Sequence, residues 1–421
     1  MSNELRAMTR QFVEGSAFQQ AIAAVERDPY HFPTDFWRRC VEIGGLAMDI
    51  PEEYGGGLLD PVDQAAIMEE LARGHAGLSL SVLVQNSLTA FPINQFGSEE
   101  QKQKYLPRMA QGELVACFGL SEPARGSDAK GIQLTARKDE ERGGWRLNGI
   151  KRWITNADRA GVIVLATRTG TTESRGDGIT VFLAEIGPDV EGFSVPKPHD
   201  KIGQFGSTLC DVIFENVHVP DGAIMGEVNA GWEIINSTLE HSRVWIAAQG
   251  SGLALAALDE AEAYTAERVQ FGRPLKDMPP VANHLAVMRR QVELAQFLVN
   301  KAARHESEGD ELAFVWASLA KLIASETCLF VASDAMLLHG GTGYVNDLPI
   351  SRIYRDSGVL RIYEGAAHIQ VRIIERYLER DRIMALFPPS AGLMRDASEL
   401  TPLETLTAEI ESWQPGLLAV R

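Results

Sequence analysis

One carboxylate, Glu364, stands beside a glycine in the segment RIYEGAAHIQ, residues 361–370, where a helix is expected to begin. An acidic residue at a helix start is most often a solvated charge that the helix dipole favours. The same group can instead act as a general base, because apolar surroundings raise the pKa of a carboxylate. The segment alone leaves both interpretations open.

Two further stretches carry polar side chains in a turn and on an expected strand. GLSEPARGSDAKG, residues 119–131, could offer backbone N–H groups and the hydroxyls of Ser121 and Ser127 to a polar ligand. Turn-rich loops between strands are common, however, so an ordinary connection is an equally open interpretation. RWITNAD, residues 152–158, places Trp153 ahead of Thr155, and the alternative here is a core tryptophan with its N–H satisfied.

Two glycine-containing stretches end long helical patterns. HGGTGYVND, residues 339–347, has Gly340 and Gly341 where a helix would stop, without the strand and the G-x-G-x-x-G spacing of a dinucleotide site. ERVQFGRPL, residues 267–275, ends another helix. Its arginines could hold a pyrophosphate through paired hydrogen bonds, or could simply complement the helix dipole.

Composition excludes several classes of function. The chain has 421 residues, of which 45% are hydrophobic and 23% charged, and its net charge of −17 argues against a nucleic-acid partner. Its four cysteines are far apart and not at metal-ligand spacing, which favours buried reduced thiols over zinc or disulfides. We see no basic and apolar leader and no run of about 18 uninterrupted apolar residues. We therefore expect no membrane span, no metal site and a cytoplasmic location.

Helical, strand-rich and again helical patterns follow one another along the chain. Residues 1–112 read as a helical domain, in which Ser98 and Gln101 form a capping box and Gly112 ends the helix. Residues 113–228 contain short Val, Ile, Thr and aromatic runs without intervening helices. Residues 229–385 carry four long helical segments, the last over 366–380, and 386–421 are an extension. The fold class is therefore α+β, with a middle antiparallel β-barrel or sandwich and a C-terminal four-helix bundle.

The order of these motifs resembles that of the acyl-CoA dehydrogenase family of flavoproteins over residues 30 to 382. The stretches that carry the resemblance are IPEEYGG, SEPARGSD, NGIKRWITNA, FENVHVP, ERVQFGRPL, HGGTGY and IYEGAAHIQ. The resemblance implies bound FAD, an acyl-CoA thioester substrate and α,β-dehydrogenation, with hydride passing from Cβ to flavin N5. It also implies a homotetramer that is reoxidised by an electron-transfer flavoprotein.

The resemblance assigns roles residue by residue. Glu364 matches the catalytic base, and Gly365 beside it lets the backbone approach the thioester. Residues implied to contact FAD in the same subunit are Phe118, Leu120, Ser121, Ser127, Trp153 and Thr155, with Ser127 also placed near the acyl-CoA arm. Residues implied to reach the FAD of a neighbouring subunit are Arg268, Phe271, Gly340 and Gly341. Arg243 matches the arginine near the CoA nucleotide, and Glu240 is either solvated or bound to that end of the substrate. Some members carry the base just before this arginine, where this chain has Ser242.

The chain departs from the family pattern at four sites. Arg125 adds a positive charge to the flavin loop, and Met278-Pro279, Leu337 and Ala366 replace polar residues that usually contact FAD. Two alternatives therefore stay open. One keeps the fold but acts on a carrier-protein thioester, or as a flavin-dependent oxidase, oxygenase or thioester lyase. The other is a non-catalytic subunit that binds acyl-CoA.

Overall fold

A computed structural model describes residues 2–388 and 400–413. The chain divides into two compact units, which are described separately. One consists of Met1–Glu14, Asp60–Ala76 and Arg243–Arg421, and the other of Gly15–Leu59 and Gly77–Ser242. The domain boundaries at residues 112, 228 and 385 remain sequence predictions. Of the FPPSAG segment, residues 389–392 lie outside the described residues.

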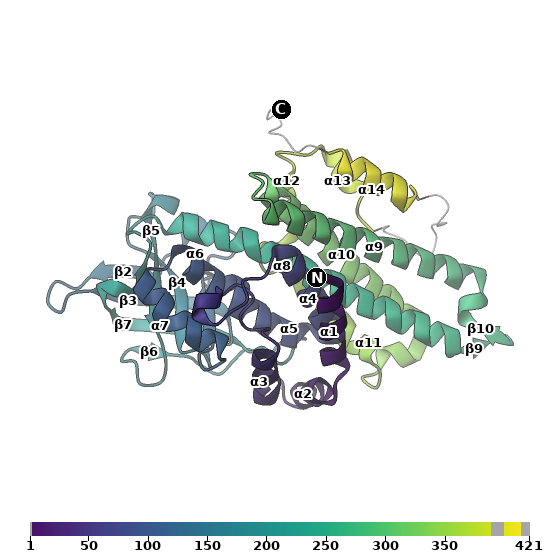
Figure 1. Cartoon of the computed structure of the whole chain (residues 1–421), viewed down its shortest axis with the longest axis horizontal. Helices are drawn as coiled ribbons and strands as arrows, with labels where there is room; N and C mark the ends of the chain where they lie inside the picture. Colours follow the sequence, from purple (N-terminus) through teal and green to yellow (C-terminus); the bar gives the residue numbers. More distant parts are fainter. Residues whose placement is uncertain (1, 389–399, 414–421) are drawn as a thin grey trace. The chain divides into compact units, whose positions relative to one another are not determined.

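The N-terminal part is helical, as the sequence predicts (Figure 1). Its elements are α1 (Ser2–Glu14), α2 (Ser16–Arg27), α3 (Thr34–Glu42), η1 (Glu52–Tyr54), α4 (Pro61–Gly74), α5 (Ala76–Leu83), the π-helix η2 (Val84–Ala90), α6 (Phe91–Phe96) and α7 (Glu99–Ala110). The capping box at α7 is confirmed: the Ser98 hydroxyl accepts from the Gln101 N–H at 3.2 Å, and the Gln101 side chain accepts from the Ser98 N–H at 3.0 Å. Gly112 follows α7 with a left-handed φ of +69°.

The strand-rich runs expected within residues 113–228 form strands of one sheet. Its strands are β1 (Ala116–Gly119), β2 (Thr135–Lys138), β3 (Trp145–Thr155), β4 (Val162–Arg168), β5 (Ile179–Glu185), β6 (Phe193–Ser194), β7 (Leu209–Val219) and β8 (Ile224–Met225). The strand order is β6-β7-β3-β2-β4-β5-β8, with β1 also paired to β4. The expected antiparallel pairing holds except that β1 and β2 run parallel to β4. After β1 the chain forms the β2–β3 hairpin and then enters β4, which runs in the same direction as β1.

Strand β4 is apolar almost throughout because both faces of the sheet are covered at this strand. Val162, Val164 and Ala166 pack in one core cluster with residues of α6 and α7, among them Ile93 and Leu106. Ile163 and Leu165 pack in a second cluster with Leu147 and Phe214. Successive side chains of a strand point to opposite faces, so burial of both faces produces an unbroken apolar run.

The C-terminal part contains the long helices. Its elements are α8 (Gly231–Glu267), the β9–β10 hairpin (Val269–Gln270 and Arg273–Pro274), α9 (Pro279–Ser307), α10 (Ala313–Leu338), η7 (Gly340–Tyr344), α11 (Pro349–Ser357), η8 (Gly358–Arg361), α12 (Ala367–Ile374), α13 (Arg380–Met384) and α14 (Leu403–Glu411). The expected fourth long helix over 366–380 is wrong: α12 ends at Ile374 and α13 begins at Arg380. Helix α10 packs against α9, α11 and α12.

Two helical stretches, Ala76–Phe96 and Ala313–Leu338, are long and apolar enough to cross a membrane by length and composition. Their most apolar windows are 94% and 78% buried inside the protein, respectively. Burial of this extent is what the core helices of a globular fold require.

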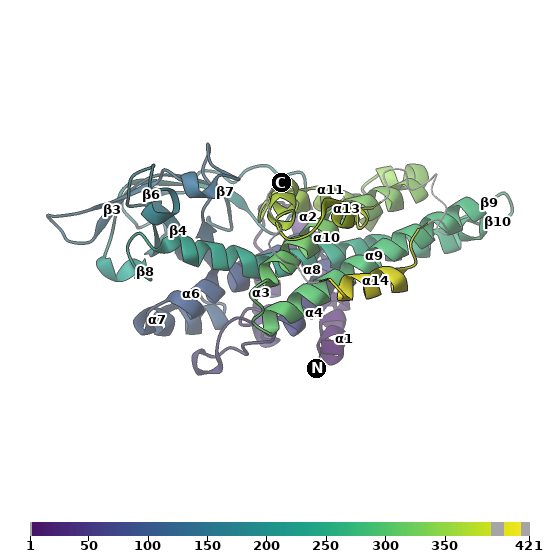
Figure 2. The ribbon, with the colours of Figure 1, turned by 90° about the horizontal axis from the view of Figure 1, so that it is seen from above.

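Helix α14 of the C-terminal extension lies along α9 (Figure 2). The Lys301 ammonium of α9 lies 3.0 Å from the Glu411 carboxylate of α14, and the Arg290 guanidinium donates to the Thr401 carbonyl at 2.9 Å. Leu406 and Ile410 of α14 are buried. The described part of the extension is therefore a packed element of its unit.

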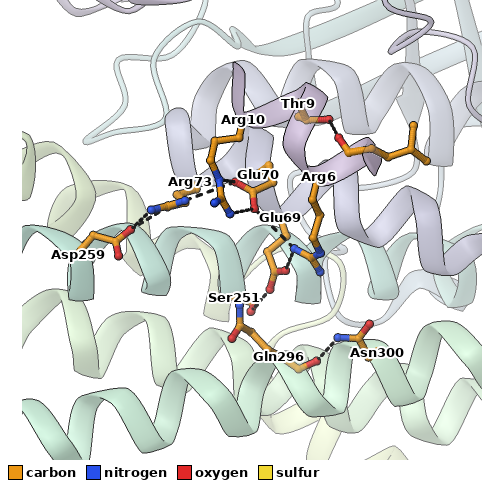
Figure 3. Close-up of polar contacts among 11 residues, drawn as sticks. Arg6, Thr9, Arg10, Glu69, Glu70, Arg73, Ser251, Asp259, Gln296 and Asn300 are labelled. Carbon is orange, nitrogen blue, oxygen red and sulfur yellow. Dashed lines mark hydrogen bonds and ion pairs between the residues drawn. The ribbon is translucent and has the colours of Figure 1, made fainter. Parts of the chain in front are cut away.

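Buried acidic residues of α4 tie α1 and α8 to that helix (Figure 3). The Arg6 guanidinium of α1 donates to the Glu69 carboxylate, which also accepts from the Ser251 hydroxyl of α8 at 2.5 Å. Arg10 binds both carboxylate oxygens of Glu70, at 2.7 and 3.2 Å. Because Glu69 is 1% exposed, its charge depends on these partners.

We expect Arg6→Ala to destabilise the protein by about 3 kcal/mol, since it leaves the buried Glu69 carboxylate without its cation. Thermal unfolding measures the effect. Arg38→Ala is the control, because Arg38 pairs with Asp35 at an exposed site and should shift the midpoint little. Equal midpoints for Arg6→Ala and the wild type would contradict a stabilising role for this contact.

Candidate active site

Glu364 lies in a turn that only a few residue types adopt. Its φ is 51° and that of Gly365 is +93°, so two successive residues are left-handed just before α12. A Cβ on Gly365 would lie 2.4 Å from the Gln370 side-chain nitrogen, which explains the glycine. The Gln370 amide donates to the carbonyls of Glu364 and Gly365, at 3.1 and 3.0 Å. The turn is thus fixed by a buried side chain of the helix that follows it.

Helix α10 holds the same segment from its other side. The Ser325 hydroxyl donates to the Leu360 carbonyl at 3.0 Å, and the Lys321 ammonium donates to the Gly365 carbonyl at 2.8 Å. Arg361 and Glu326 form an ion pair at 2.8 Å. Contacts one helical turn apart therefore hold both ends of the segment that carries Glu364.

The ammonium that binds the Gly365 carbonyl is influenced by other charges of its unit. The pKa of the Lys321 ammonium is lowered to about 7, mainly by burial. The attraction of the Glu364 carboxylate partly offsets this effect, and the positive charge of Arg243 adds to it. Arg243 is 6% exposed and belongs to α8. The expected base and the expected CoA-binding arginine thus both act on the charge of Lys321. Sequence reasoning did not include Lys321, although it is the one Lys or Arg in the apolar α10.

The other candidates on α8 have contacts within their own helix. The Asn236 amide donates to the Glu240 carboxylate at 2.8 Å, and the Ser242 hydroxyl donates to the Leu239 carbonyl at 3.2 Å. Ser242 carries no carboxylate, so Glu364 remains the candidate base.

A buried glutamine positions β1, which leads into the flavin loop. The Gln85 side chain of η2 donates to the Leu114 carbonyl at 2.8 Å and accepts from the Ala116 N–H at 3.0 Å. Phe118, half-buried, lies on this anchored strand, and Leu120, buried, directly follows it. A π-helix is rare and is often found at functional sites.

A buried ion pair lies under the loop at Ser121. The Lys151 ammonium of β3 lies 2.8 Å from the Glu122 carboxylate and donates to the Leu120 carbonyl at 2.9 Å. Glu122 also accepts from the N–H groups of Gln133 and Leu134, at 2.7 and 2.8 Å. Ser121 is held by its neighbours, while its own side chain stays half-buried.

Further along the loop, Ser127 is exposed. The Arg125 guanidinium donates to the carbonyls of Gly131 and Ala124, both at 3.0 Å. The extra positive charge of this loop therefore stabilises the loop's own backbone.

Trp153 points outward, so the core-tryptophan interpretation is wrong. The pairing of β3 with β7 shifts register between Lys151 and Ile154, on either side of Trp153. The φ of Trp153 is 65°, and the residue is 53% exposed. A β-bulge re-aims side chains in this way. Thr155, two residues on, is half-buried.

The candidates for a neighbouring subunit's cofactor are exposed. Phe271, at the tip of the β9–β10 hairpin, has a φ of 52° and is 94% exposed. Arg268 precedes the hairpin and is exposed, as are Gly340 and Gly341. A Cβ on either glycine would meet nothing within 4 Å, so both leave open space in this chain.

The residues of the sheet unit fit a flavin. The exposed Trp153 indole offers an apolar face, which is suited to a planar ring. The hydroxyls of Ser121 and Thr155 make no hydrogen bond within residues 2–388 and 400–413, so both remain available to a polar ligand.

Family models cover almost the whole chain. The acyl-CoA dehydrogenase N-terminal domain matches residues 2–113, the middle domain 117–217 and the C-terminal domain 229–379.

Individual proteins agree with these matches. The human mitochondrial short-chain specific acyl-CoA dehydrogenase is 38% identical over 373 residues, which is 88% of either chain. The butyryl-CoA dehydrogenase of Megasphaera elsdenii is 34% identical with a TM-score of 0.83, over 89% of this chain and 97% of that one. A chain from a structural study of the electron transferring flavoprotein of Acidaminococcus fermentans is 34% identical with a TM-score of 0.84. The match covers 90% of this chain and 98% of that one. This protein belongs to the acyl-CoA dehydrogenase family, the FAD-dependent oxidoreductases that act on the CH–CH group of acyl-CoA thioesters.

Proposed function

We propose that this protein oxidises a short-chain acyl-CoA to its 2,3-unsaturated thioester, with Glu364 as the base that removes the α-proton. The observation that carries the proposal is the left-handed Glu364–Gly365 turn, held from both sides by α10 and α12. A carboxylate fixed in this way can be aimed at one atom of a bound substrate. The short-chain preference rests on the named activities of the human and Megasphaera relatives.

The chain's own residues supply proton removal and substrate positioning. Glu364 takes the α-proton, and the glycine beside it lets the thioester approach the backbone. Arg243, a buried cation of α8, would neutralise a phosphate of CoA. FAD, when bound, accepts the hydride from Cβ. Trp153 would cover one flavin face, while the hydroxyls of Ser121 and Thr155 would serve its polar ring atoms.

Two partners complete the proposal. The exposed Phe271, Arg268, Gly340 and Gly341 favour a second copy of the chain whose FAD they would contact, within a homotetramer. The similarity to the Acidaminococcus chain supports electron-transfer flavoprotein as the electron acceptor. Location in the cytoplasm remains a prediction.

Anaerobic titration of the purified flavoprotein with acyl-CoAs of increasing chain length tests the reaction. We expect bleaching of the oxidised flavin absorbance, strongest with short chains. In Glu364→Gln the rate of bleaching should fall about a thousandfold, because the amide cannot accept the proton, while FAD stays bound. Glu379→Gln, an exposed position after α12, is the control. A colourless protein that does not take up FAD, or full reduction in Glu364→Gln, contradicts the proposal.

Arg243→Ala tests the use of free CoA. We expect KM for an acyl-CoA to rise about ten- to a hundredfold, since one charge-assisted contact to a remote part of the substrate is lost. The kcat should change little. Steady-state kinetics with a short acyl-CoA and with its truncated pantetheine thioester measure this, and Arg372→Ala, on the exposed face of α12, is the control. Equal KM values in Arg243→Ala and the wild type would point to a carrier-bound or shorter substrate.

A further inference from the structure

Lys321 is a buried cation in the largely apolar helix α10. Its residue is 0% exposed, and α10 contains no other Lys or Arg. Placing an ammonium in such surroundings is costly unless other groups compensate for its lost hydration. The Lys321 ammonium donates to the Gly365 carbonyl at 2.8 Å.

That carbonyl does not require a cation. The neutral amide of Gln370 already donates to it at 3.0 Å, and also to the Glu364 carbonyl. An uncharged donor at position 321 would hold the turn at a lower desolvation cost. The hydrogen bond alone therefore does not explain why residue 321 is positively charged. The neighbouring charges provide an explanation.

The charges that act on Lys321 come from three elements. Glu364 attracts it from the turn before α12, Arg243 repels it from α8, and Glu326 attracts it from α10 itself. Glu326 is already paired with Arg361 at 2.8 Å. From α12 the facing group is the neutral Gln370. The Glu364 carboxylate is thus the principal anion for this ammonium.

We propose that Lys321 is a positioning residue for Glu364: its ammonium pins the carbonyl beside the base and holds the base in its ionised form before substrate turnover. This inference rests on the proposed role of Glu364. It adds a residue that determines over which pH range the base is active.

The direction of the pH effect follows from the charges. Because burial lowers the pKa of Lys321 to about 7, the ammonium is present below that pH and is lost above it. While protonated, it favours the carboxylate over the carboxylic acid, so Glu364 stays ionised to lower pH. Once Glu364 has taken the α-proton, the attraction disappears, so the two groups titrate as a coupled pair.

Two substitutions in the holoenzyme separate the charge from the hydrogen bond. Lys321→Gln keeps a donor for the Gly365 carbonyl and removes the charge, whereas Lys321→Met removes both. In both variants we expect the acid limb of the kcat/KM profile to move to higher pH, by about one pH unit. Lys276→Gln, at an exposed position, removes a charge as the control and should leave the limb in place. An unchanged acid limb in Lys321→Gln would overturn the electrostatic role.

Amide hydrogen exchange of residues 361–370 gives a readout that does not depend on turnover. We expect faster exchange in Lys321→Met than in Lys321→Gln, because only the former loses the donor to the turn. Equal exchange in Lys321→Met and the wild type would overturn the pinning role. A failure of the proposed function is distinguishable from these outcomes. It would appear as full flavin reduction in Glu364→Gln, whether or not the hydrogen exchange of the Lys321 variants changes.

Discussion

Two consecutive left-handed residues at Glu364 and Gly365 are the constraint on which the rest of this active site depends. A non-glycine residue with positive φ costs on the order of 1 kcal/mol or more and persists only where its surroundings fix it. Here the surroundings are a lysine from α10 and a glutamine from α12, which both donate to the Gly365 carbonyl. Helix α10 thus helps to hold the strained turn through Lys321, while α12 holds it through Gln370.

In the other unit, too, a buried lysine binds a backbone carbonyl of a loop. There the loop after β1 is held by Lys151, which contacts the Leu120 carbonyl and the Glu122 carboxylate from a neighbouring strand. Burial lowers the pKa of Lys151 to about 8, as it lowers that of Lys321. In both units a buried ammonium on a regular element pins a backbone carbonyl in an irregular segment. An ammonium has three donors on a long stem, so it can reach a loop that a backbone amide of the same element cannot.

The sequence predicted those features that depend on local patterns. The capping box at Ser98, the apolar runs of β4 and α10 and the glycine stops follow from periodicity and turn chemistry, and the structure contains them. Features that depend on distant partners were not predictable. The parallel pairing of β1 with β4, the bulge that turns Trp153 outward and the early end of α12 are set by tertiary packing. Lys321 was visible as the one Lys or Arg of a largely apolar helix, but only the structure shows that it binds the carbonyl next to Glu364.

Three of the departures from the family pattern lie outside the core of the unit that contains them. Leu337 is exposed, and Met278 and Ala366 are half-buried, so none of them fills a core position of its own unit. Replacing a polar side chain at such a site leaves no buried group unsatisfied, and the fold itself tolerates the change. Under the proposed function, any loss at Met278 and Leu337 would appear in the binding of FAD by the exposed hairpin and glycine turn. Ala366 is different, because it is the N-cap of α12 and its carbonyl accepts from the N–H groups of Ile369 and Gln370. A substitution at this position therefore adjoins the turn that carries Glu364, so it can affect the proposed base as well as the cofactor.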